Sequence, residues 1–168
     1  VHYYELVRTL RESPVALMPG RRIQDLFSAR FILDNGKLKN MEEPLAIEIG
    51  PFRAFQNPHG VPRAYIAHQF EVVDDETALR RMAGPGWNPR MKVLLDAVPE
   101  FAGSGGPAAE DGIELLEDGN DVFQAKVSTN APALFVLHDS YYPGWRATVD
   151  GQPVSILRAN YMFRAVAL

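Results

Sequence analysis

Three aromatic residues near the C-terminus, Tyr141, Tyr142 and Trp145, are grouped closely enough to form a platform for a carbohydrate. Aromatic rings offer large apolar faces that stack on the C–H face of a sugar, and neighbouring polar groups can bind its hydroxyl or phosphate groups. The residues that would complete such a site are Asp139, Arg146, Arg158, Asn160 and Tyr161. These eight residues are the candidate contacts for a glycan or another acceptor.

The same aromatic group also has a purely structural interpretation. Pro143-Gly144 is typical of a corner in the chain. Trp145 would then fill the core of a β-sandwich, and a tyrosine hydroxyl would fix the loop, because buried tyrosines and tryptophans usually find a hydrogen-bond partner. The sequence alone leaves both interpretations open.

The sequence lacks the other residue patterns that commonly carry chemistry. The four histidines, His2, His59, His68 and His138, form no HExxH or HxH pair, so we expect no metal site. The acids of residues 74–76 suit a helix N-terminus, and no two carboxylates are marked out as a glycosidase pair. The sequence contains no GxSxG, no phosphate-binding loop and no dinucleotide fingerprint. We therefore expect neither a catalytic residue nor a cofactor in this chain.

Composition places the chain among folded globular proteins. Its 168 residues are 46% hydrophobic and 23% charged. A net charge of -4 gives no reason to expect a nucleic-acid partner. The chain has no cysteine, and its apolar runs are far shorter than the roughly 20 residues that cross a bilayer. It opens at Val1 with neither a start methionine nor a signal-peptide pattern, so we expect it to be a piece of a longer protein.

The first hundred residues predict a mixture of helices and strands. Apolar residues at positions 3, 6, 7 and 10 have the spacing of one helix face, and a second short helix is expected over 23–27. A helix is also expected from Asp74 to Met82, with acids in its first turn. Expected strands cover residues 30–34, 45–49, 52–56, 62–73 and 91–95.

Residues beyond the first hundred predict a linker and then only strands. Residues 101–109, rich in Gly and Ala, are the expected linker. Expected strands cover 113–116, 122–129, 133–139, 145–150, 154–157 and 162–168, with tight turns at Gly119-Asn120 and Asp150-Gly151. The fold class is thus α+β and mostly β. An α+β subdomain (1–100) precedes an antiparallel β-sandwich subdomain (110–168), whose last strand is expected at a truncated edge.

Three blocks of sequence resemble the C-terminal soluble region of bacterial YfhO-type membrane proteins. The most specific block is DSYYPGWRATVDG followed by RANYMFRAV, over residues 139–151 and 158–166. It is similar to the family pattern DxYYPGWxAxVDG followed by RANxxFRAV. Residues 55–65, which include QN and PRAY, and residues 25–33, DLFSARFIL, form the second and third blocks. Their order and spacing match over nearly the whole chain, although Gln56 stands where the family often has glutamate, and His138 where a small polar residue is common.

The resemblance implies a role outside the cytoplasm. Such proteins are multi-pass glycosyltransferases of the GT-C type, thought to move a sugar from a polyprenyl-phosphate carrier on the outer side of the cytoplasmic membrane. Their catalytic acid is expected near the first transmembrane helices, so no catalytic residue is carried over to this chain. The implied partners are the membrane domain of the same parent chain and a glycan or polyprenyl-linked sugar.

These observations leave three hypotheses about function. The first is a non-catalytic extracytoplasmic domain of a glycosyltransferase-like membrane protein, which positions an acceptor glycan or packs on the membrane domain. The second is a carbohydrate-binding module with its platform at Tyr141, Tyr142 and Trp145. The third is a free-standing hydrolase, which activity on sugar substrates would reveal.

Overall fold

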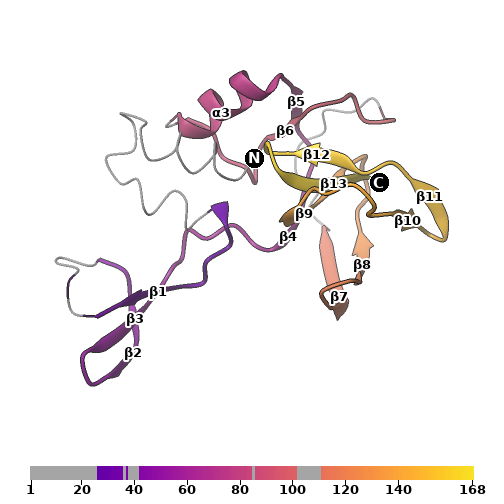
Figure 1. Cartoon of the computed structure of the whole chain (residues 1–168). Helices are drawn as coiled ribbons and strands as arrows, with labels where there is room; N and C mark the ends of the chain where they lie inside the picture. Colours follow the sequence, from indigo (N-terminus) through magenta and orange to yellow (C-terminus); the bar gives the residue numbers. More distant parts are fainter. Residues whose placement is uncertain (1–25, 36, 38–41, 85, 102–110) are drawn as a thin grey trace.

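The computed structural model describes residues 26–35, 37, 42–84, 86–101 and 111–168. Within these ranges the chain is mostly β with a single helix, which confirms the predicted mostly-β α+β class (Figure 1). The helix expected at residues 3–10, the start of the one expected over 23–27 and most of the linker lie outside the described residues. The described elements are β1 (Phe31–Asp34), β2 (Leu45–Ile49), β3 (Phe52–Gln56), β4 (Ala64–Ala67), β5 (Phe70–Val72), α3 (Asp75–Ala83), β6 (Val93–Leu95), β7 (Gly112–Asp118), β8 (Phe123–Ser128), β9 (Leu134–Ser140), β10 (Ala147–Val149), β11 (Gln152–Val154), β12 (Leu157–Ala159) and β13 (Phe163–Ala167).

The largest sheet has six strands in the order β4-β9-β13-β12-β6-β5. All neighbours pair antiparallel except β5 and β6, which are parallel. Its two edge strands, β4 and β5, are joined by His68 and Gln69 alone. Because a residue spans at most about 3.6 Å, the two edges must lie within roughly 11 Å of each other. The sheet is therefore curled until its edges nearly meet.

This curl corrects the prediction of one long strand over residues 62–73. The alternating pattern does run through the segment, but the chain bends at His68 and changes neighbours there. Before the bend it pairs with β9, and after it with β6. The pairing partners, which are distant in sequence, determine the bend.

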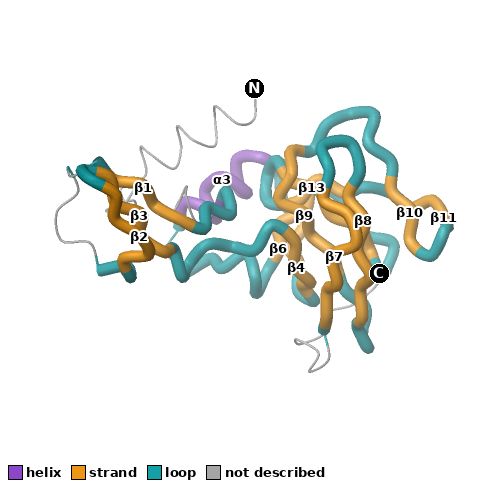
Figure 2. Tube along the Cα trace, turned by 90° about the horizontal axis from the view of Figure 1, so that it is seen from below, coloured by secondary structure: helices purple, strands orange, loops and turns teal. Residues whose placement is uncertain are grey.

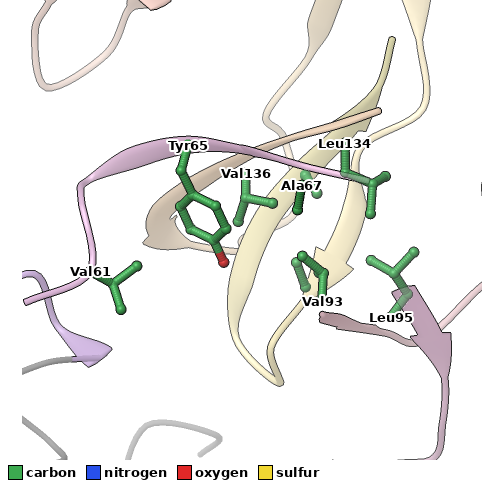
Figure 3. Close-up of a cluster of buried hydrophobic side chains, with 9 residues drawn as sticks. Val61, Tyr65, Ala67, Val93, Leu95, Leu134 and Val136 are labelled. Atoms are coloured by element: carbon green, nitrogen blue, oxygen red, sulfur yellow. The ribbon is translucent and has the colours of Figure 1, made fainter. Parts of the chain in front are cut away.

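The inside of the curled sheet is a core of small and medium apolar side chains. Tyr65, Val93, Leu95, Leu134 and Val136 point into it from three strands (Figure 3). The remaining members are Val61, Ala67, Ala159 and Ala165. Three alanines suit the interior of a tightly curled sheet, where facing walls are close and large side chains would clash.

A second core lies between the outside of this sheet and helix α3. The helix begins after Asp74, whose carboxylate accepts a hydrogen bond from the Thr77 N–H at 2.7 Å, as predicted for a helix N-cap. Its buried residues are Ala78 and Met82, and Met82 is fully buried. They pack with Leu26, Trp87, Leu94, Tyr161, Met162 and Phe163. Strand β6 is buried on both faces because Val93 and Leu95 point inside while Leu94 faces the helix.

The predicted subdomain boundary at residues 101–109 does not divide the core. Strands β4, β5 and β6 come from before the boundary, and β9, β12 and β13 from after it, yet all six share one sheet. Among the described residues, strands of the two predicted subdomains therefore share one sheet and one core. Strand β13, expected at an edge, lies between β9 and β12.

Both turns predicted in the C-terminal part are confirmed, and a third turn was missed. Gly119-Asn120 lies in the hairpin between β7 and β8, where the Gly119 N–H donates to the Val122 carbonyl at 2.9 Å. Asp150 and Gly151 both have positive φ, +50° and +78°, as a two-residue hairpin turn between β10 and β11 requires. Asn160 and Tyr161 also have positive φ, +46° and +72°, and form an unpredicted turn between β12 and β13. The strand expected over 154–157 is wrong, since β11 ends at Val154 and β12 begins at Leu157.

A separate three-stranded sheet, β1-β3-β2, extends away from the curled sheet in both views (Figures 1 and 2). Its strands fall where the sequence predicts them. Asn57 ties its base to the preceding segment through hydrogen bonds from its backbone N–H to the Arg30 carbonyl and from its side chain to the Ala29 carbonyl, both 2.9 Å long. The hairpins β7-β8 and β10-β11 form two further small sheets.

Candidate functional site

Asp139 is the centre of a charged cluster at one end of the curled sheet. Its carboxylate accepts hydrogen bonds from Arg63, at 3.0 and 3.2 Å, and from Arg164, at 2.8 Å. Arg63 also forms an ion pair with Asp118, which lies at the end of β7. Two arginines and two aspartates thus neutralise one another. We call these four residues the Asp139 cluster.

Strand pairing brings the Asp139 cluster together. Strand β9, which carries Asp139, lies between β4 and β13, so Arg63 just before β4 and Arg164 on β13 flank it. A register shift between Phe163 and Arg164 accompanies this arrangement. Arg164 is buried, which lowers the pKa of its guanidinium, while the charge and hydrogen bond of Asp139 act in the opposite direction.

Trp145 lies beside this cluster and is half-buried. The Arg164 guanidinium lies over its ring, 4.1 Å from the centroid, so one aromatic face is already covered by a cation–π contact. Trp145 belongs to neither buried core. It therefore does not fill the interior, and it offers at most one face to a ligand.

The other residues predicted beside Trp145 face the solvent. Tyr141 is 41% exposed and Tyr142 is 71% exposed, and Arg146 is also exposed. Gly144, with a φ of +107°, makes the corner that the Pro-Gly pair predicts. The predicted site residues within positions 139–146 are neighbours in sequence. Tyr142 is the most exposed of their aromatic side chains.

The remaining predicted site residues, Arg158, Asn160 and Tyr161, serve the fold. Asn160 is fully buried; its Oδ1 accepts the Leu94 N–H at 3.0 Å, and its Nδ2 donates to the Tyr65 hydroxyl at 2.9 Å. Tyr161 is buried in the core beneath α3. Asn160 and Tyr161 are therefore inaccessible to a glycan that approaches from solvent.

Arg158 acts as a clamp between three segments. Its guanidinium donates to Asp75 of α3 at 2.6 Å, to Asp96 after β6 at 3.2 Å and to the Tyr161 carbonyl at 2.9 Å. Burial acts to lower the pKa of Arg158, but the two carboxylates more than offset this, so its pKa is raised. These contacts fix helix α3 on the sheet. They also occupy the Arg158 guanidinium, which is therefore not available to bind a ligand.

Two histidines that the sequence leaves without a role, His138 and His68, both have structural partners. His138 stacks on Phe163 with centroids 4.2 Å apart, and its Nδ1 lies 3.3 Å from the Ser28 Oγ. Burial lowers the pKa of His138 to about 4, so its ring is neutral at neutral pH. His68, at the bend between β4 and β5, has its ring nitrogens 3.0 Å from the Pro132 carbonyl and 2.7 Å from Asp111.

Neither a metal centre nor a membrane-spanning helix is present within the described ranges. In those ranges no three His, Asp or Glu side chains are grouped so that they could hold a metal ion. No helix there is long and apolar enough to span a membrane.

Sequence reasoning missed a surface on the three-stranded sheet. Five large apolar side chains on one face of it are 49–80% exposed: Phe31, Leu33, Ile47, Ile49 and Phe52. A sixth, Leu45, is 51% exposed and pairs with Phe55 on the other face. Leu33, Ile47, Ile49 and Phe52 line an open groove of about 730 Å³. Ala54 and the charged residues Asp34, Lys37 and Arg53 line it as well. The signal available in the sequence was the alternation of apolar residues at positions 31 and 33 and at 47 and 49.

Comparison of the chain with family models, with curated proteins and with solved structures finds no match. The sequence motifs and the geometry of the described residues are therefore the observations that bear on function.

Proposed function

We propose that this chain is a non-catalytic, extracytoplasmic domain of a multi-pass, glycosyltransferase-like membrane protein of the YfhO type. In this proposal the domain lies on the outer side of the cytoplasmic membrane. There it either packs on the membrane domain of its own parent chain or positions an acceptor glycan. The resemblance over residues 139–151 and 158–166 supports the assignment to this family. In this proposal the full-length parent protein is the enzyme, and this domain has a non-catalytic role in it.

The observation that carries the non-catalytic role is the internal pairing of the candidate polar residues. Asp139 is bound by two arginines, and Arg158 is bound by two aspartates. A general acid or base must reach the substrate, and its pKa must suit the pH at which it works. Carboxylate oxygens that already accept hydrogen bonds from guanidinium groups are occupied by those contacts, which suits structural ion pairs better than contact with a substrate.

The parent reading frame tests the proposal directly. Multiple apolar segments of about 20 residues, encoded before Val1, would support it. A frame without them would contradict the assignment to a membrane protein. Activity of the isolated domain on sugar substrates would contradict the non-catalytic role and favour the hydrolase hypothesis.

A carbohydrate-binding module is the second candidate, favoured by the exposure of Tyr141 and Tyr142 beside the half-buried Trp145. Calorimetric titration with a panel of glycans would test it. Binding that is lost in Tyr142→Ala, a variant at a 71% exposed position, would support a platform because the fold does not depend on this ring. Unchanged binding in that variant, or no binding in the wild type, would count against it.

A further inference from the structure

The three-stranded sheet has two faces of opposite character. Pairing places Asp34, Arg53 and Glu48 opposite one another on one face. On that face Asp34 and Arg53 form an ion pair, Ile32 and Phe55 are buried, and Leu45 is 51% exposed. Since side chains alternate along a strand, the neighbouring positions point to the other side.

On that other side, which we call the apolar face, lie Phe31, Leu33, Ile47, Ile49, Phe52 and Ala54, with the polar Gln56 opposite Phe31 at one end. None of these side chains carries a charge. The five large ones are 49–80% exposed, and the sheet stands clear of the curled sheet in both views (Figures 1 and 2). Single exposed apolar residues are ordinary, but a contiguous patch of this kind marks an interaction surface.

The size of the apolar face suits a protein interface. Large apolar side chains bury roughly 150–250 Å² each when fully covered, so the exposed parts of five amount to on the order of 500 Å². That approaches the roughly 600 Å² per partner found at the small end of specific protein interfaces. It also lies at the upper end of the patches that monomers leave open.

We infer that the apolar face is a homodimer interface, on which the same face of a second copy packs. The shape favours this occupant, because Leu33, Ile49 and Phe52 are 62–80% exposed, whereas Ala54, which also lines the groove, is only 7% exposed. Two copies related by a two-fold axis place the projecting side chains of each above the groove of the other. Two sheet faces packed in this way form a sandwich about 10 Å thick.

Charge also favours a second copy over a lipid surface. Strands β1, β2 and β3 carry Asp34, Glu48 and Arg53 and no excess of basic residues. Surfaces that bind anionic membranes carry clusters of Lys and Arg around the apolar side chains. The charged residues that line the groove, Asp34, Lys37 and Arg53, are of both signs, and Asp34 and Arg53 already form an ion pair. A two-fold axis therefore brings no cluster of a single sign together. The inference rests on the sheet alone and holds whether or not the proposed function is correct.

Sedimentation equilibrium of the chain at up to about 100 µM tests the inference, because this range detects dimers with dissociation constants down to the affinity of weak, micromolar complexes. The wild type is expected to dimerise, and Leu33→Asp to raise the dissociation constant at least about 100-fold, because the two-fold axis introduces the charge twice. Leu116→Asp is the matched control: Leu116 is a 55% exposed leucine on β7, outside the apolar face. A monomeric wild type, or an equal loss in both variants, overturns the inference.

Cross-linking locates the contact without depending on affinity. The chain has no cysteine, so single-cysteine variants report one position each. A bismaleimide linker is expected to join Ile47→Cys into a covalent dimer and to leave Leu116→Cys monomeric. Equal cross-linking of the two variants contradicts the inference. So does binding of the monomer to neutral phosphatidylcholine vesicles that Leu33→Asp abolishes, because lipid would then be the occupant.

Discussion

The curled six-stranded sheet and the three-stranded sheet β1-β3-β2 use the same kinds of residues in opposite ways. In the curled sheet, apolar side chains fill two cores, and buried Asn160 is bonded to the backbone and to Tyr65. On the apolar face of the three-stranded sheet, five large apolar side chains remain 49–80% exposed. The first region is stable through its own contacts, whereas the second is completed by a partner. The difference in exposure therefore distinguishes apolar residues that stabilise the fold from apolar residues that are available to bind a partner.

Asn160→Ala is expected to destabilise the curled sheet more than any other variant considered. The change leaves the buried Leu94 N–H and Tyr65 hydroxyl without the side chain that bonds them. Each unsatisfied buried group costs about 1–3 kcal/mol, so we expect a loss of about 4 kcal/mol in the free energy of unfolding. Urea unfolding measures it. Asn160→Gly, which tolerates the φ of +46° better, should lose less; equal stability of Asn160→Ala and wild type would show that these bonds are unimportant.

A pair of leucine substitutions compares the two regions directly. Leu134 is fully buried inside the curled sheet, and Leu33 is 80% exposed on the apolar face. Leu134→Ala is expected to cost about 3 kcal/mol through the cavity it leaves. Leu33→Ala should change the stability of the monomer by less than about 0.5 kcal/mol. Similar losses in the two variants, measured by urea unfolding at low protein concentration, would remove the distinction between the regions.

The pH dependence of stability reports on His138 in the curled sheet. Burial lowers its folded pKa to about 4 from the ordinary 6.5, so below pH 6.5 the unfolded chain takes up a proton that the folded chain does not. Stability should therefore fall as the pH falls from 6.5 towards 4, by about 2 kcal/mol between about pH 7 and pH 5. His138→Phe, which keeps a ring for Phe163 to stack on, should remove this component. If its slope with pH matches that of the wild type, another group is responsible.

The smallest effect is expected for Trp145, at the boundary between folding and binding. Trp145→Leu removes the cation–π contact with Arg164, and such contacts contribute about 0.5–2 kcal/mol. We expect a loss of about 1 kcal/mol in the free energy of unfolding, measured in urea. A loss above about 3 kcal/mol would restore the interpretation of Trp145 as a core residue.

The sequence predicts those parts of the fold that depend on local chemistry. Asp74 and the apolar positions after it define helix α3, and Asp150-Gly151 defines a hairpin, because a helix cap and a positive-φ turn need particular residue types. The bend at His68 could not be predicted in this way. The alternation of side chains continues through it, and only the distant strands β9 and β6 show where the chain changes partners.

The candidate site was predictable only where its residues are neighbours in sequence. Asp139 and Trp145 lie near each other as expected, but Arg63 joins them from 76 positions away through the pairing of β4 with β9. Asn160 looked like a binding residue because it is a polar side chain that follows the aromatic group closely in sequence. The apolar face was missed because alternation identifies a shared face, not whether anything covers it.

Hydrogen–deuterium exchange at two protein concentrations tests the contrast between the two sheets most directly. Raising the concentration from about 1 µM to about 100 µM should slow exchange in β1, β2 and β3, because the second copy stabilises that sheet when it covers the apolar face. Exchange in β9 and β13, which the chain stabilises by its own contacts, should not change. Unchanged exchange in β1–β3, or equal slowing in both sheets, would contradict the account.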